Sequence, residues 1–198
     1  FMAQGLLDLY EAGFVETHVH NAIALTNRMR ELFEDKENGG FFSTAPDDPA
    51  LVMRVKEDYD GAEPSGNSIA ILNLLRLARI TGQVGFSQAG AHALDSFGQR
   101  MASGPTGLPQ MLAALLFRFS PPRQVVLAGE RADITGMLAE FRRRFLPFHT
   151  ILWAGNTTLN PELANMPPVA GQATAYVCEN FACQLPVNDT RQFAGLLQ

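Results

Sequence analysis

One segment of this sequence is apolar around most of its helical circumference, and this pattern limits the folds that the chain can adopt. Residues 64–81 carry leucine or isoleucine at positions that fall on several faces of a helix: Ile69, Ile71, Leu72, Leu74, Leu75, Leu77 and Ile80. Such a helix is buried by neighbours on nearly all sides. The pattern therefore predicts a helix within a group of helices, ended by Gly82.

The segments before and after this helix predict further helices, arranged in hairpins. Apolar residues at helical spacing indicate a helix that ends near Gly13 and further helices over residues 16–35, 86–101 and 108–119. Two extended stretches, GGFFST and LVMRVKE, flank a Pro/Asp turn and predict a short β-hairpin near residues 40–57. We therefore expect helical hairpins over residues 1–120, with this short β-hairpin among them.

The pattern changes after Pro121 and Pro122. QVVLAG fits a short buried strand, ADITGMLAEFRRRF a helix and HTILWAG a second strand, an order that is typical of a βαβ unit. TAYVC and QLPV predict further short strands, and a last helix is expected from about Asp189. The predicted fold is mainly α, with a small α/β subdomain over residues 121–198.

Composition excludes several classes of function. With 198 residues, 46% of them hydrophobic, and a net charge of -5, the chain can form one sizeable globular core or two small ones. The one dense basic run, Arg142 to Arg144, fits a solvated helix end better than a phosphate site, so we expect no nucleic-acid partner. No apolar stretch has the length of a bilayer and no signal-peptide pattern opens the chain, so we expect no membrane association and a cytoplasmic location.

Acidic and small polar residues are concentrated immediately before the apolar helix, in the sequence KEDYDGAEPSGNS over residues 56–68. A helix start needs only one capping residue, or one cap and one acid. Backbone N–H groups at a helix N-terminus favour anions or hydroxyl groups, and paired carboxylates can divide acid and base roles. The segment therefore predicts either a ligand site or an elaborate cap with solvated acids.

Four segments resemble one protein family in sequence and in order. GGFFST, VKEDYDGAEPSGNSIAILNLLRLARITG, QVVLAG and AYVCENFACQLPV are similar to segments of the DUF255 family, also described as thioredoxin-domain-containing or spermatogenesis-associated 20-like proteins. The resemblance implies a parent protein with a thioredoxin-like domain and an (α/α)6 toroid of the N-acylglucosamine 2-epimerase or six-hairpin glycosidase type. This chain, which begins at Phe1 within an apolar helical pattern, then corresponds to a fragment, the C-terminal part of the toroid.

The resemblance also implies a place for the acid-rich segment, because loops before inner helices line the central funnel of such toroids. The expected acid/base or hydroxyl-binding residues are Glu57, Asp58 and Asp60. The residues expected to bind substrate are Lys56, Tyr59, Glu63, Ser65, Gly66 and Asn67. The implied ligand is a carbohydrate or a related polyhydroxylated compound, handled by a glycosidase- or epimerase-like parent without metal or cofactor. The alternative is a non-catalytic docking or scaffold region for the thioredoxin-like redox domain of the parent.

The resemblance has a consequence for assembly as well. A closed toroid buries the flanks of its inner helices against neighbouring hairpins, and part of the toroid is absent from a fragment. Apolar faces are then expected at the open edges, over residues 1–33 and 108–119. Because two copies can cover such faces around a two-fold axis, we expect a homodimer of the isolated fragment.

The cysteines and histidines give weaker signals. Cys178 and Cys183 have neither the C-x-x-C spacing of a redox pair nor that of a zinc site, so free structural thiols are favoured over a disulfide, and both over a redox or metal role. His18 and His20 lie two residues apart on an expected helix and point to different faces, so they cannot chelate one metal ion.

Overall fold

The computed structural model describes residues 1–46, 53–180 and 182–197. The chain forms two compact units, Phe1–Phe119 and Ser120–Gln198, and each is described by itself. The first unit is helical and the second combines helices with a small mixed sheet, which fits the predicted mainly α class with a small α/β part.

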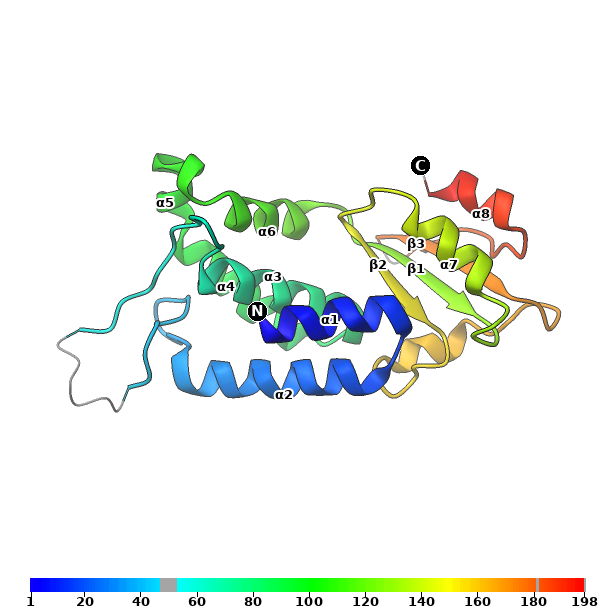
Figure 1. Ribbon diagram of the computed structural model, residues 1–198, viewed down its shortest axis with the longest axis horizontal. Coiled ribbons are helices and arrows are strands. Elements are labelled where there is room, and N and C mark those ends of the chain that lie inside the picture. Colours follow the sequence, from blue (N-terminus) through cyan, green and yellow to red (C-terminus); the bar gives the residue numbers. More distant parts are fainter. Residues whose placement is uncertain (47–52, 181, 198) are drawn as a thin grey trace. The chain divides into compact units, whose positions relative to one another are not determined.

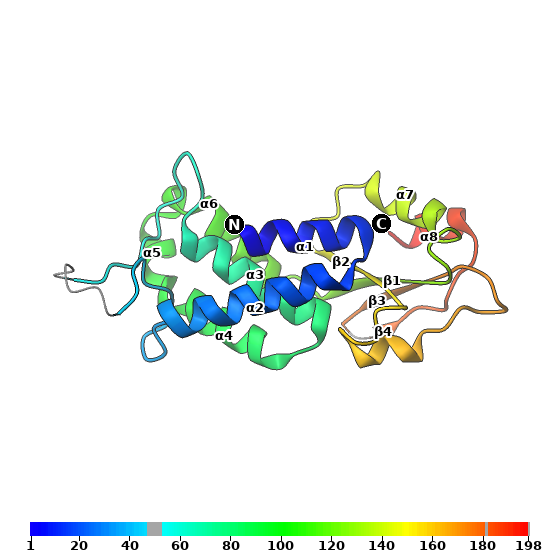
Figure 2. The ribbon, with the colours of Figure 1, turned by 60° about the horizontal axis from the view of Figure 1, so that its bottom comes forward.

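The described residues of the N-terminal unit form helices α1 to α6 and one 3-10 turn. They are α1 (Met2–Gly13), α2 (Glu16–Phe33), α3 (Gly66–Thr81), α4 (Val84–Ser96), α5 (Gly98–Ser103), η1 (Pro105–Gly107) and α6 (Pro109–Phe119). The two blue helices in Figure 1, α1 and α2, pack side by side as a hairpin. Figure 2 shows the same pair from another direction.

The predicted apolar helix is present as α3, and it packs against α1, α2, α4 and α6. Its leucines and isoleucines are buried, apart from the half-buried Leu72. Ser65 caps the start of the helix through its Oγ, which accepts the Ser68 N–H at 3.1 Å. Gly82 ends the helix with φ 71°, a left-handed conformation that favours glycine. The prediction of a helix surrounded by helices is therefore confirmed.

The helix predicted over residues 86–101 is broken into α4 and α5 at Phe97. Glycine at position 98 lowers the helix propensity at this point. The turn that follows α2 packs closely on α4, because a Cβ added to Gly39 would lie 2.5 Å from the His92 carbonyl oxygen. Gly39 and Gly40 both have φ 75°, so glycine is needed here for backbone conformation as well as for space.

The region of the predicted β-hairpin contains no regular strand within the described residues. Phe41 forms an isolated bridge with Glu34, and the Ser43 N–H donates to the Val55 carbonyl at 2.8 Å. The Pro/Asp turn of the expected hairpin falls within residues 47–52, which lie outside the described residues. The hairpin therefore stays a prediction.

The C-terminal unit is built on a sheet of strand order β2-β1-β3-β4. Its elements are β1 (Arg123–Ala128), α7 (Thr135–Arg142), β2 (His149–Trp153), η2 (Pro161–Asn165), β3 (Thr174–Glu179), β4 (Ala182–Cys183) and α8 (Thr190–Leu196). Strands β1 and β2 are parallel and are joined through α7, so the predicted βαβ unit is confirmed. Figure 1 shows β1 between β2 and β3. Asp189 caps α8 by accepting the N–H groups of Arg191 and Gln192.

The prediction of free thiols in this unit is wrong, because Cys178 and Cys183 form a disulfide. The two residues are directly opposite each other where β3 pairs with the antiparallel β4. A separation of five residues is thus the span of a tight hairpin, which a comparison with C-x-x-C spacing does not reveal. The segment expected as the strand QLPV continues beside β3, where Val187 forms an isolated bridge with Ala175.

Candidate functional site

Three residues of the acid-rich segment, Asp60, Ser65 and Asn67, have buried and hydrogen-bonded side chains. We call these three residues the base of the segment, in the structural and not the chemical sense. Asp60 accepts the Ser65 N–H at 2.8 Å through Oδ1, and the N–H groups of Gln110 and Met111 at 2.8 and 3.1 Å through Oδ2. The residue before α6 is Leu108, which has no side-chain oxygen to cap the helix. Asp60 therefore caps α6 from a distant part of the chain and stabilises its positive end.

Asn67 joins two other segments to the start of α3. Its Oδ1 accepts the Phe41 N–H at 2.7 Å, and its Nδ2 donates to the carbonyls of Phe41 and Glu57 at 2.9 and 2.7 Å. Because Asn67 is only 3% exposed, these bonds satisfy an amide that is costly to bury unpaired. The contact with the Glu57 backbone fixes the position of that residue beside α3.

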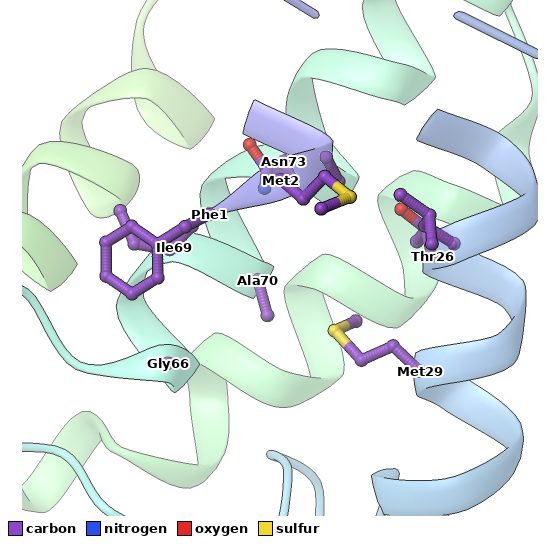
Figure 3. A pocket seen from close by; sticks show the side chains of 10 residues that line it. Phe1, Met2, Thr26, Met29, Gly66, Ile69, Ala70 and Asn73 are labelled. Carbon is purple, nitrogen blue, oxygen red and sulfur yellow. The ribbon is translucent and has the colours of Figure 1, made fainter. Parts of the chain in front are cut away.

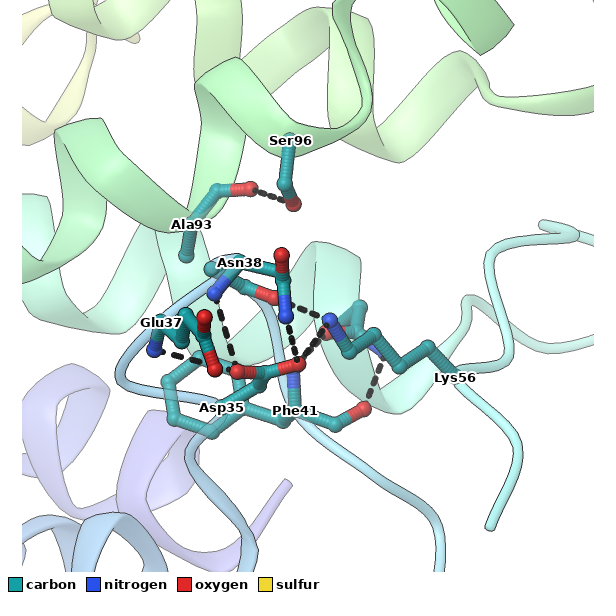
Figure 4. Close-up of polar contacts among 9 residues, drawn as sticks. Asp35, Glu37, Asn38, Phe41, Lys56, Ala93 and Ser96 are labelled. Atoms are coloured by element: carbon teal, nitrogen blue, oxygen red, sulfur yellow. Dashed lines mark hydrogen bonds and ion pairs between the residues drawn. The ribbon is translucent and has the colours of Figure 1, made fainter. Parts of the chain in front are cut away.

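Lys56 lies in a polar cluster that also holds the turn after α2 (Figure 4). Its Nζ is 2.7 Å from Asp35 Oδ2 and donates to the Gly39 carbonyl at 2.6 Å. The Lys56 ammonium and the Asn38 N–H hold the pKa of Asp35 well below its ordinary value. The cations of Arg54 and Lys56 also lie over the Phe42 ring, at 4.0 and 5.0 Å from its centroid. Lys56 is thus occupied with holding the loop together.

Of the remaining acids in the segment, Asp58 forms an ion pair, whereas Glu57 and Glu63 are exposed. Asp58 Oδ2 accepts from Arg100 Nε at 3.1 Å, which ties the segment to α5. Glu57, Tyr59 and Glu63 are exposed, and we call these three residues the rim. Within the described residues, the carboxylates of Glu57 and Glu63 have no hydrogen-bonding or ion-pair partner, so they are available to a ligand.

A pocket of about 290 Å³ opens beside Asn67 of the base and Glu57 of the rim. It is lined by residues of α2 and α3 and by the segments near Phe41 and Glu57: Met29, Phe33, Phe41, Phe42, Ser43, Glu57, Gly66, Asn67 and Ala70. Three of the predicted site residues, Glu57, Gly66 and Asn67, therefore meet at one pocket. The other predicted residues do not line it.

The aromatic wall of this pocket was not predicted as part of a site. The sequence pattern places Phe41 and Phe42 in an extended segment and Phe33 on the apolar face of a helix. Their arrangement depends on the bonds from Asn67 to Phe41, which join residues 26 positions apart. No local spacing in the sequence carries that signal, although two adjacent aromatics after Gly-Gly mark a place where the chain turns.

Chemically, the pocket combines aromatic surface with one exposed carboxylate. Glu57 is the one acid that lines it among the described residues. Glycoside hydrolysis commonly uses two carboxylates on either side of the scissile bond. The described part of the chain shows one such group here, with Asp60 engaged by backbone N–H groups and Asp58 by Arg100. This arrangement suits binding of hydroxyl groups.

Other candidate sites find no support in the part of the chain that the structure describes. No group of three or more His, Cys, Asp or Glu residues there could hold a metal ion. None of the described helices combines the length and the apolar character needed to cross a membrane.

The fold and the pocket define a mainly helical chain with a small α/β part and a hollow of small-molecule size. No protein-family model matches the chain. The chain is 35% identical to the human protein named spermatogenesis-associated protein 20, in an alignment of 206 residues that includes 100% of this chain and 26% of the human protein. Identity to the rat protein of the same name is 34%, again over 100% of this chain and 26% of the rat protein.

A more distant relative is an uncharacterized protein of Caenorhabditis elegans, 27% identical over 99% of this chain and 27% of that protein. The similarity to the human and rat proteins supports the resemblance to spermatogenesis-associated 20-like proteins that the sequence indicated. The chain spans about a quarter of the length of these relatives. It therefore carries only a part of what the whole proteins contain.

Proposed function

We propose that the N-terminal unit binds a carbohydrate or a related polyhydroxylated compound in the pocket beside Glu57. The observation that carries this proposal is the 290 Å³ pocket, which sets an exposed carboxylate against an aromatic wall. A volume of this order lies at the lower limit of the range for ligand pockets, which combine apolar walls with a few polar groups. Sugars offer hydroxyl donors to a carboxylate and apolar C–H faces to aromatic rings.

Within this proposal the predicted site residues have unequal roles. Glu57 contacts the ligand, and Asn67 positions Glu57 through its backbone carbonyl, at 2.7 Å. Asp60 holds the segment on α3 and α6. An acid/base reaction in the parent then needs a second carboxylate at this pocket, and Asp58 reaches that role only by leaving Arg100.

We also propose that α3 is an inner helix of an (α/α)6 toroid in a longer parent with a thioredoxin-like domain. Its support is the family resemblance, together with the contacts of α3 with α1, α2, α4 and α6. The homodimer expected for the isolated chain is part of this proposal. Exposed apolar side chains on α1 and α6 support it: Met2, Leu9, Leu116 and Phe119.

Self-association is checked by light scattering of the 198-residue chain over a wide range of concentrations. A mass of twice 21.6 kDa is expected. Replacing Phe119 by serine, at an exposed position of α6, should lower the dimer fraction without loss of fold. A mass near 21.6 kDa at all concentrations would contradict the dimer.

The binding proposal is tested by methyl NMR of the chain labelled at methionine, because Met29 lines the pocket. Glucose, mannose, N-acetylglucosamine and maltose are titrated as probes, with mannitol as an open-chain polyol. At least one of the sugars should shift the Met29 methyl signal with saturation, and Glu57→Gln should abolish that shift. Glu63→Gln, at an exposed rim position outside the pocket lining, is the matched control and should leave it unchanged.

A further inference from the structure

We propose that a second pocket of the N-terminal unit binds a compact apolar group that carries one hydrogen-bond donor, seated against Asn73. The pocket lies among α1, α2 and α3, has a volume of about 180 Å³ and is shown in Figure 3. Its polar lining residues, Thr26 and Asn73, differ from those of the first pocket, Ser43, Glu57 and Asn67. The proposal therefore holds whether or not the first pocket binds a sugar.

The observation that points to a ligand is an unpartnered acceptor. Asn73 is 4% exposed and lines the pocket, and its Oδ1 is buried without a hydrogen-bond partner among the residues that the structure describes. A buried acceptor that is left unpaired destabilises a fold, and a leucine at this position of the apolar helix α3 would avoid that cost. A donor supplied by a ligand would satisfy Oδ1.

The walls of the pocket define the rest of the ligand. Met2, Leu25, Met29 and Ile69 supply apolar surface, and Thr26, which is 2% exposed, adds a hydroxyl group from α2. Figure 3 shows Thr26 and Met29 on one side of the pocket and Ile69 and Ala70 on the other.

None of the described side chains that line the pocket is charged, so they offer no countercharge to a charged group. An apolar cavity of about 150 Å³ is large enough to bind benzene. The pocket therefore fits a neutral aromatic ring system with one N–H or O–H group.

The two pockets can be distinguished by their methionines. Met29 lines both pockets, whereas Met2 lines only the one that contains Asn73. A ligand seated against Asn73 should therefore shift both methyl signals. A ligand confined to the Glu57 pocket should shift Met29 alone.

The test uses two probes that match in shape and differ in the donor. Indole carries an N–H group, and benzothiophene has the same two-ring outline without one. Both are titrated into the methionine-labelled chain and into the variant Asn73→Leu. Indole should shift Met2 and Met29 with saturation, and its preference over benzothiophene should fall about tenfold in Asn73→Leu, the change that corresponds to one hydrogen bond of about 1.4 kcal/mol. Taking the ratio in each protein cancels the difference in hydration between the probes.

Two further variants keep the result unambiguous. Asn73→Ala replaces Asn73→Leu if the larger side chain prevents folding, and Glu57→Gln should leave indole binding unchanged. The proposal is overturned if Met2 shows no saturable shift, or if the preference for indole is the same in the variant and in the natural sequence. Because exposed Met2 also supports the proposed dimer, all titrations are made at one fixed protein concentration, so that a shift of the Met2 signal reports the added probe.

Discussion

The base and the rim of the acid-rich segment lie within 11 residues of each other, at positions 57–67, yet their side chains are in opposite states. The base residues Asp60 and Asn67 are buried, and their polar atoms bond to backbone groups of other segments. The rim residues Glu57 and Glu63 are exposed and have no such partners within the described residues. Acids that look equivalent in the sequence therefore divide into those that hold the fold and those that are available to a ligand.

This difference shows what a concentration of acids can mean. Part of the segment acts as an elaborate cap, which is one of the two interpretations that the sequence allowed. Asp60 caps α6 and Ser65 caps α3. Another part borders a pocket at Glu57. The two interpretations of the segment therefore apply to different residues, and substitutions can separate them.

The largest expected effect comes from Asp60→Ala in the base. The change leaves the N–H groups of Ser65, Gln110 and Met111 without their acceptor, and the free energy of unfolding should fall by about 3 kcal/mol. Urea denaturation followed by circular dichroism measures this loss. The rim variant Glu63→Ala is the control and should stay within about 0.5 kcal/mol of the natural sequence. Equal losses of unfolding free energy in both variants would contradict the difference between the base and the rim.

A second effect concerns the disulfide of the C-terminal unit. It lies outside the acid-rich segment, and the stability lost with it gives a reference for the size of the Asp60 effect. Replacing Cys178 and Cys183 together by serine removes a short covalent loop and should lower the stability of that unit by about 2 kcal/mol. Alkylation of the unfolded protein without reductant should label neither cysteine, whereas labelling follows reduction. Labelling of both cysteines without reductant would contradict the disulfide.

A third prediction concerns Lys56. This residue is adjacent to Glu57 of the rim in sequence, but its ammonium group contacts Asp35 and the Gly39 carbonyl. The pKa of Asp35 is lowered in the fold, so the stability from this contact is present above the ordinary pKa of 3.8 and is lost as the pH falls below it. Lys56→Met should therefore weaken the loss of stability between about pH 4 and pH 2, in addition to lowering stability at neutral pH. Urea midpoints measured across this pH range test the prediction.

Lys36→Met is the matched control for this change, because Lys36 is exposed and follows Asp35 directly. It should leave the acid dependence unchanged. If both lysine variants alter the acid dependence equally, then the effect reflects net charge and not the contact between Lys56 and Asp35.

The sequence predicted elements that depend on local patterns. Apolar residues around most of the helical circumference predicted that α3 is surrounded by other helices. The alternation of strand, helix and strand predicted the parallel pair β1 and β2. Both signals lie within one continuous stretch of chain. The capping of α6 by Asp60 was not predicted, because the two bonds span 50 and 51 residues. The disulfide was missed for a different reason, since the turn that brings its cysteines together was not recognised.

The candidate site was predicted in position but not in the roles of its residues. A cluster of acids before a buried helix identified the segment, and Glu57 does line a pocket there. Which acids are free depends on tertiary partners such as Arg100, 42 residues from Asp58. Asn73 was not singled out from the sequence, and it becomes a candidate because its Oδ1 is buried without a partner in the described part of the chain.

The smallest expected change in stability, and the most direct test, comes from Glu57→Gln. Its unfolding free energy is measured in urea with and without the sugar that shifts Met29 most strongly. Without sugar, the variant should match the natural sequence within about 0.5 kcal/mol, because Glu57 belongs to the rim. With sugar at ten times the dissociation constant, the natural sequence should gain about 1.4 kcal/mol and the variant nothing. A variant that is destabilised without sugar, or that gains as much as the natural sequence, would contradict the division between base and rim.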